Sequence, residues 1–229
     1  MKIEIWSDVV CPFCYIGKRK FELALEQFQG KENVEIVWKS FQLDPGTRTV
    51  AGLSVIEHLA EKKGISIEHS EKMHENVTMA AAEVGLEYNF DKAQVANTLK
   101  AHQLTHFAAK HNLQFKAEEV LFKAYFTEGK NIDDIETLGA IAEEIGLNKD
   151  EAITSIQSKT LLNEVQKDID EAQQLGVRGV PFFVFNRQYA VSGAQPVEVF
   201  SDVLQKVAQE ESKLKEVISG DSCDINGNC

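Results

Sequence analysis

The chain has 229 residues, of which 43% are hydrophobic and 26% are charged. A chain of this length and composition buries a sizeable core and folds without disulfide bonds. The formal net charge of -12 repels nucleic acids and anionic membrane surfaces, and no basic cluster compensates for it. We therefore expect neither a nucleic-acid partner nor a membrane partner.

The N-terminal segment predicts a β-strand, a helix and a second β-strand. Apolar and charged side chains alternate over residues 2–6, and a second β-rich run covers residues 34–41. Between them, apolar residues recur at helical spacing from residue 16 to 28 and end near Gly30. The segment CPFC therefore lies at the start of the helix.

The middle of the chain, from about residue 50 to 176, is helical in pattern almost throughout. We expect helices at residues 54–63, 67–84, 92–111, 117–128, 134–145, 149–157 and 160–175. Asp91 is the expected N-cap of the helix at 92–111, and Asp133 with Glu136 resembles a capping box.

The pattern returns to β-structure after Gly176. We expect a strand at residues 180–185, a pairing strand at 189–191 and a final helix from Pro196 to about Val217. Neither β-rich flank makes a complete sheet alone, so the two flanks join into one sheet that a helical insertion interrupts. The expected fold class is α/β.

The two cysteines of CPFC could be metal ligands, redox partners or buried core thiols. Backbone N–H groups at a helix start stabilise an anion, which favours the thiolate of Cys11, and Cys14 lies one turn further along. Pro12 suits the first helical position, where its missing N–H has no intrahelical acceptor. A zinc site needs four ligands, and Cys223 and Cys229 lie far away in the sequence. We favour thiol–disulfide chemistry and expect no metal.

The first residues, MKIEIW, lack the apolar stretch of roughly 7–15 residues that marks a secretory signal. No later segment approaches the ~20 apolar residues of a membrane span. We therefore expect a cytoplasmic protein, a compartment in which structural cysteines are kept reduced.

A second motif, GVRGVPFFV at residues 176–184, places Pro181 at the start of a strand. A cis Val180–Pro181 bond is one way to accommodate a proline there. Together with CPFC and the helical insertion, the motif resembles the DsbA-like branch of the thioredoxin superfamily. The segments SDVVCPFCYIGK, FQLDP, NTLKAH and SGAQ are similar to the FrnE subfamily of cytosolic DsbA-like proteins.

The resemblance implies a thiol–disulfide oxidoreductase whose thioredoxin fold is split by a large all-helical insertion. The thioredoxin-like domain comprises residues 1–46 and 178–217, the insertion residues 47–177, and a flexible tail residues 218–229. Expected partners are disulfide-containing proteins or small thiols, among them glutathione, and the chain is a monomer or a homodimer. No metal or organic cofactor is required.

The resemblance also implies roles for individual residues. Cys11 is the nucleophile, Cys14 resolves the mixed disulfide, and a cis Pro181 lies against both. The backbone of Val180 can then pair with an extended substrate chain. Phe13 stands where this subfamily commonly has Trp, and it offers no hydrogen bond or charge to a thiolate, which argues against a strongly oxidising potential.

Two other functions stay open. Kappa glutathione transferases and hydroxychromene-carboxylate isomerases share this architecture, but they typically carry Ser at the position of Cys11. A chaperone or binding module could use the helical block to hold extended chains. The presence of both cysteines favours redox exchange.

The tail sequence SCDINGNC contains Cys223 and Cys229. They are either incidental thiols of a polar end or a second dithiol that closes through the Asn-Gly turn and exchanges with Cys11. FrnE-type proteins with an extra C-terminal pair suggest the second interpretation, which we favour.

Four further polar or aromatic residues have two interpretations each. His102 and His106, four residues apart, are a packed or surface pair rather than a metal site. His102 belongs to the NTLKAH segment and alternatively lines the cleft that faces Cys11. Trp6 and Asp8, which precede CPFC, belong either to the core and a turn or to the cleft.

Overall fold

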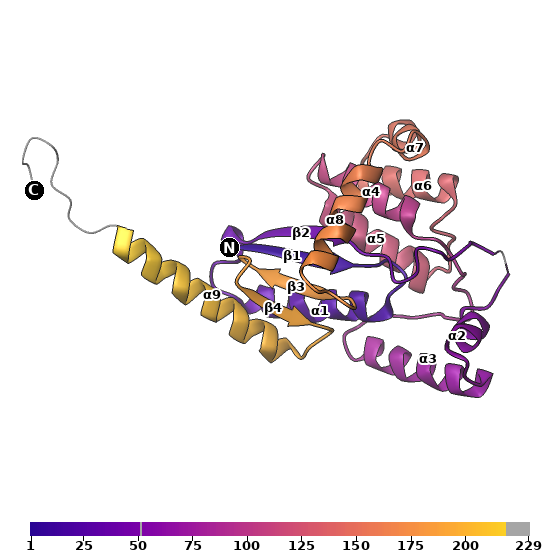
Figure 1. Ribbon diagram of the computed structural model, residues 1–229, viewed down its shortest axis with the longest axis horizontal. Coiled ribbons are helices and arrows are strands. Elements are labelled where there is room, and N and C mark those ends of the chain that lie inside the picture. The colour runs from indigo at the N-terminus through magenta and orange to yellow at the C-terminus, as the bar shows by residue number, and fades with distance from the viewer. Residues whose placement is uncertain (51, 219–229) are drawn as a thin grey trace, which may run out of the picture.

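Four strands form one mixed sheet, in the order β2-β1-β3-β4 (Figure 1). The computed structural model describes residues 1–50 and 52–218. Strand β1, Lys2–Ser7, pairs in parallel with β2, Glu35–Ser40. Strand β3, Phe182–Phe185, pairs antiparallel with β1 and with β4, Tyr189–Ser192. The two β-rich flanks thus join in one sheet, as predicted.

Helices connect the strands. Helix α1, Pro12–Gln27, and a short 3-10 helix, Lys31–Asn33, form the crossover between β1 and β2, and α9, Val197–Ile218, follows β4. The insertion between β2 and β3 holds α2 Val55–Lys63, α3 Ile67–Ala82, α4 Leu99–Ala109, α5 Gln114–Phe126, α6 Ile135–Ile145, α7 Lys149–Gln157 and α8 Leu162–Gln174. The α/β fold with a helical insertion is confirmed, and the exact domain boundaries stay a prediction.

The sheet is covered on both faces. Because side chains alternate along a strand, Ile3 and Ile5 point to one face, where they pack with Phe21 of α1 and Phe200 of α9. Trp6 points to the other face and packs against α8. Figure 1 shows α1 and α9 along one side of the sheet and α8 across the other. Burying a large apolar side chain contributes about 1.5–3 kcal/mol.

The predicted helix at residues 92–111 was wrong in its first part. The helix begins at Leu99, and Asp91 does not cap it. Asn97 gives the physical reason, because its side chain accepts from the N–H of Leu99 at 2.9 Å and donates to the carbonyl of Thr47 at 2.8 Å. A side chain that bonds the backbone in this way stabilises a turn in place of the helix.

The cap of α6 lies one residue later than predicted. Asp134 is the N-cap, and its carboxylate accepts from the backbone N–H of Thr137 at 2.8 Å. Asp133 pairs with Lys100 at 3.0 Å and so joins α4 to the start of α6. Within the described residues, no helix combines the length and the apolarity that crossing a membrane requires.

Candidate active site

Cys11 and Cys14 lie at the start of α1, directly after the loop that leaves β1. Cys11 is the N-cap residue, with φ -86° and ψ 111°, and Pro12 begins the helix as predicted. The backbone N–H of Cys11 donates to the carbonyl of Asp8 at 2.9 Å, and the N–H of Cys14 donates to the carbonyl of Cys11 at 3.0 Å. These bonds fix the turn in which the two thiols face each other one helical turn apart.

The two thiols differ in their surroundings. Cys11 is 4% exposed and Cys14 is fully buried. Burial raises the pKa of the Cys14 thiol well above its ordinary value, and the hydrogen bond and charge of Cys11 add to this effect. Cys14 therefore stays protonated until its neighbour reacts.

The chain that enters β3 lies against the pair. The Val180–Pro181 peptide bond is cis, as expected. The Cys11 thiol donates to the carbonyl oxygen of Val180, with an Sγ to O distance of 3.5 Å. Gly17 of α1 faces the proline, since a Cβ atom there would lie 2.8 Å from Cγ of Pro181. Our sequence analysis missed Gly17, although a glycine inside a helical pattern is a signal of close packing.

A pocket of about 430 Å³ opens beside the Cys11 thiol. Its walls come from the CPFC turn, from α2 and α3, from the segment before α4, and from Gly179 and Val180. Phe13 lines the pocket and is 47% exposed. Cys11 is therefore the thiol of the pair that a molecule in the pocket can reach.

A tyrosine that the sequence did not single out holds the CPFC turn. The hydroxyl of Tyr88 donates to the carbonyl of Pro12 at 2.7 Å, across 76 positions of sequence. Tyr88 also stacks on Phe126, with ring centroids 4.5 Å apart. The turn is thus fastened to the aromatic core of the insertion.

A family model described as a DSBA-like thioredoxin domain matches residues 2–205. The chain belongs to this DsbA-like family. Among solved structures, it is similar to a probable DsbA oxidoreductase from Streptomyces coelicolor, with 37% identity, a TM-score of 0.86, and coverage of 92% of this chain and 91% of that one. Family membership thus places this protein among the DsbA-like thiol oxidoreductases, while the FrnE subfamily stays a prediction.

Two further relatives are more distant. The uncharacterized protein YwbO of Bacillus subtilis strain 168 is 29% identical over 215 residues, which cover 93% of this chain and 98% of YwbO. The cytosolic disulfide reductase DsbM from Pseudomonas aeruginosa, solved with GSH, is 16% identical, with a TM-score of 0.62 and coverage of 94% and 100%. The likeness to DsbM is one of fold.

Behind the DsbA-like cysteine turn lies a buried polar cluster of Asp8, His102 and Glu118. Asp8 lines the pocket, and its carboxylate accepts from the N–H of Leu43 at 2.8 Å and lies 3.3 Å from Nε2 of His102. His102 is 2% exposed and reaches the pocket through Asp8 rather than as a lining residue. Although burial opposes it, the bond to Asp8 raises the pKa of His102.

Glu118 completes this cluster from α5. Its carboxyl is 2% exposed, and one oxygen has no hydrogen-bond partner in the described part of the chain. Burial raises the pKa of Glu118 from 4.5 to about 7, against the pull of His102 and Lys18. An acid that holds its proton near neutral pH therefore lies behind the active-site loop.

The remaining predicted residues fall outside the pocket. His106 lies 3.0 Å from the carboxylate of Asp168, so the two histidines contact different acids. Trp6 is core, and its indole N–H donates to the carbonyl of Asp168 at 2.9 Å. Within residues 1–50 and 52–218, no group of three or more His, Cys, Asp or Glu side chains could hold a metal ion. Cys223 and Cys229 lie outside the described residues.

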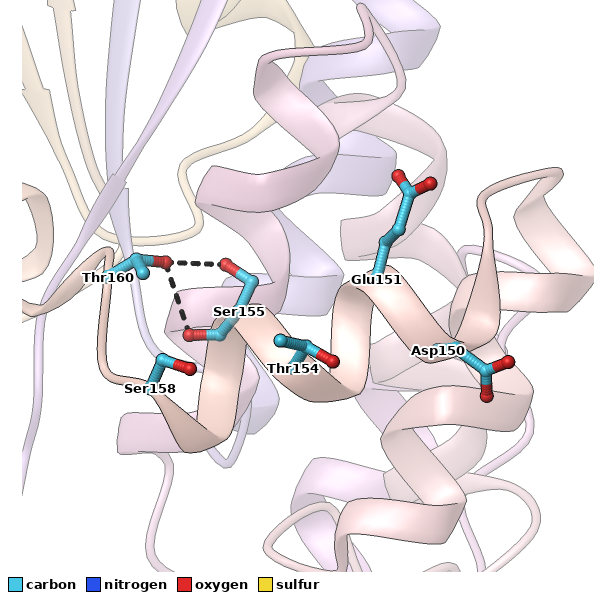
Figure 2. Close-up of a pocket in the computed structure, with 6 residues that line it drawn as sticks. All are labelled: Asp150, Glu151, Thr154, Ser155, Ser158 and Thr160. Atoms are coloured by element: carbon cyan, nitrogen blue, oxygen red, sulfur yellow. Dashed lines mark hydrogen bonds between the residues drawn. The ribbon is translucent and has the colours of Figure 1, made fainter.

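A second hollow, of about 340 Å³, lies on α7 and the turn after it. Figure 2 shows the Thr160 hydroxyl bonded to Ser155, while the carboxylates of Asp150 and Glu151 point away from this pair. Its lining consists of Asp150, Glu151, Thr154, Ser155, Ser158 and Thr160. None of these residues belongs to the cysteine site, so we place the chemistry at Cys11.

Proposed function

We propose that this DsbA-like protein exchanges thiols and disulfides through the CPFC pair. The observation that carries the proposal is the asymmetry of the pair at the start of α1. Cys11 lines a pocket and faces the Val180 carbonyl, whereas Cys14 is fully buried behind it. One thiol is thus placed to meet a substrate, and the other is placed to meet only its neighbour.

The reaction has two steps. The Cys11 thiolate attacks a substrate disulfide, so that a Cys11–substrate disulfide forms and one substrate thiolate leaves. Cys14 then gives up its proton and attacks the sulfur of Cys11, which releases the second substrate thiolate and leaves a Cys11–Cys14 disulfide. Two electrons pass from the protein to the substrate, and the reverse sequence oxidises a substrate dithiol.

The substrates are disulfide-containing proteins or small thiols and disulfides. Membership of the DsbA-like family supports this class. The carbonyl of Val180 lies 3.5 Å from the reacting sulfur, where a substrate backbone N–H can bond it beside the disulfide. A contact with the backbone alone gives loose sequence preference.

Reduction of insulin disulfides, followed by turbidity, tests the proposal. We expect Cys11→Ser to lose the activity and Cys14→Ser to accumulate a mixed disulfide that mass spectrometry detects. Cys223→Ser with Cys229→Ser is the matched control, because it removes two thiols from the tail and leaves the CPFC pair. Full insulin reduction by Cys11→Ser would rule out the proposed reaction.

The same variants separate two alternatives. A glutathione-dependent transferase or isomerase would bind glutathione saturably and keep an activity in Cys11→Ala. A chaperone would suppress aggregation equally well after all four cysteines are replaced. Our proposal predicts neither result.

A further inference from the structure

The pocket beside Cys11 is enclosed by elements from distant parts of the chain. The CPFC turn and Val180 form one wall, while α2, α3 and the segment before α4 form the others. Its volume of about 430 Å³ falls within the range of about 300–1,000 Å³ that small-molecule sites occupy. This shape suits a compact molecule better than an extended chain.

Most of the pocket surface is apolar. The insertion contributes Val55, Leu59, Met73, Val77, Phe90 and Val95. Such a lining excludes water and favours an aromatic or aliphatic body. The body of the ligand would therefore rest on α2 and α3, next to the Cys11 sulfur.

Helix α2 adds positive charge to the apolar pocket. Lys62 and Lys63 both line it at the end of α2, in a protein with a net charge of -12. Lys62 is paired with Asp44 at 2.7 Å, whereas Lys63 forms no ion pair with any residue that the structure describes. The other lining acid, Asp8, is bonded to Leu43 and His102. The charge at Lys63 is thus available to an anion.

We infer that the pocket binds a small disulfide with an apolar body and a carboxylate. The apolar body packs on α2 and α3, the carboxylate faces Lys63, and the disulfide lies at Cys11. This inference rests on the proposed function and adds a substrate class to it. Two electrons pass from the CPFC dithiol to the small disulfide, which leaves as two thiols, and an added dithiol such as dithiothreitol restores the protein.

Two aromatic disulfides of opposite charge type test the inference. Dithiobis(nitrobenzoate) carries a carboxylate on each ring, and dithiodipyridine carries none; both release a coloured thiol. The second-order rate constant of the reduced protein is measured with each probe in a Cys223→Ser, Cys229→Ser background, so that the released thiol reports the CPFC pair.

Lys63→Glu tests the charge. We expect this variant to slow the reaction with dithiobis(nitrobenzoate) about tenfold and to leave that with dithiodipyridine within about twofold. Lys72→Glu is the matched control, because Lys72 is an exposed residue of α3 that pairs with Glu75 outside the pocket. Equal effects of Lys63→Glu and Lys72→Glu would overturn the role of Lys63.

Val77→Trp tests the apolar wall. A larger ring there fills the pocket, so both probes should react at least about tenfold more slowly, while insulin reduction stays within about twofold. Met79→Trp is the control, since Met79 lies on the same helix and is 58% exposed. Unchanged rates in Val77→Trp overturn the pocket. Loss of every reaction in the parent protein would instead refute the proposed thiol exchange.

Discussion

Replacing Glu118 with Gln should change how the stability of the protein depends on pH. The Glu118 carboxyl is 2% exposed, and burial raises its pKa from 4.5 to about 7. At about 1.4 kcal/mol for each pKa unit, this interval corresponds to about 3 kcal/mol. Below pH 4.5 the carboxyl is protonated in both the folded and the unfolded chain, and its burial carries no penalty.

As the pH rises above 4.5, the unfolded chain releases this proton first, and the folded chain holds it until about pH 7. The free energy of unfolding therefore falls over that interval and levels off above it. Gln cannot ionise, so Glu118→Gln lacks this loss. Relative to the unsubstituted protein, the variant should gain about 3 kcal/mol between about pH 4.5 and about pH 8.

Urea unfolding, followed by tryptophan fluorescence at several pH values, measures the effect. His102, Lys18 and Asp8 act on Glu118 and are present in both proteins, so most of their own titration cancels in the difference. Glu144→Gln on the exposed side of α6 is the control and should give a difference that does not vary with pH. A Glu118→Gln difference that changes by less than about 1 kcal/mol would refute the reasoning.

Three substitutions test packing and charge elsewhere. Gly129→Ala should cost more than about 1 kcal/mol in urea unfolding, because φ is 69° and the new Cβ would lie 2.5 Å from Cβ of Lys92. Gly17→Ala should slow insulin reduction more than it lowers stability, because its Cβ would lie 2.8 Å from Cγ of Pro181. Asp168→Asn should cost about 3 kcal/mol at neutral pH. The pKa of Asp168 lies below 3.8, so this cost should vanish only as the pH falls below that value.

The sequence predicted the elements whose signals are local. All four strands, α1 and α9 follow from alternation, helical spacing and turn residues. The helix at residues 92–111 failed because a side chain of residue 97 bonds the backbone of residues 47 and 99. Spacing of apolar residues cannot reveal such a competitor, because its acceptor lies 50 positions away in the sequence.

The site was predictable only to the same extent. Cys11, Cys14 and Pro181 stand in two short motifs, so the sequence identified them. The Asp8–His102 contact spans 94 positions, and no local pattern announces it. Amphipathic spacing tells which face of α2 and α3 is apolar, but not that this face looks onto a cysteine.

The place of α8 limits how this protein can be taken apart or rebuilt. By chain order α8 belongs to the insertion, yet it covers Trp6 and supplies the Asp168 carboxylate that accepts from the N–H of Ser40 at 3.0 Å. A fragment in which β2 is joined directly to β3 would leave one face of its sheet bare. The two domains are thus not separable modules, and the variation that the fold can tolerate is concentrated in α2 and α3, which shape the pocket without covering the sheet.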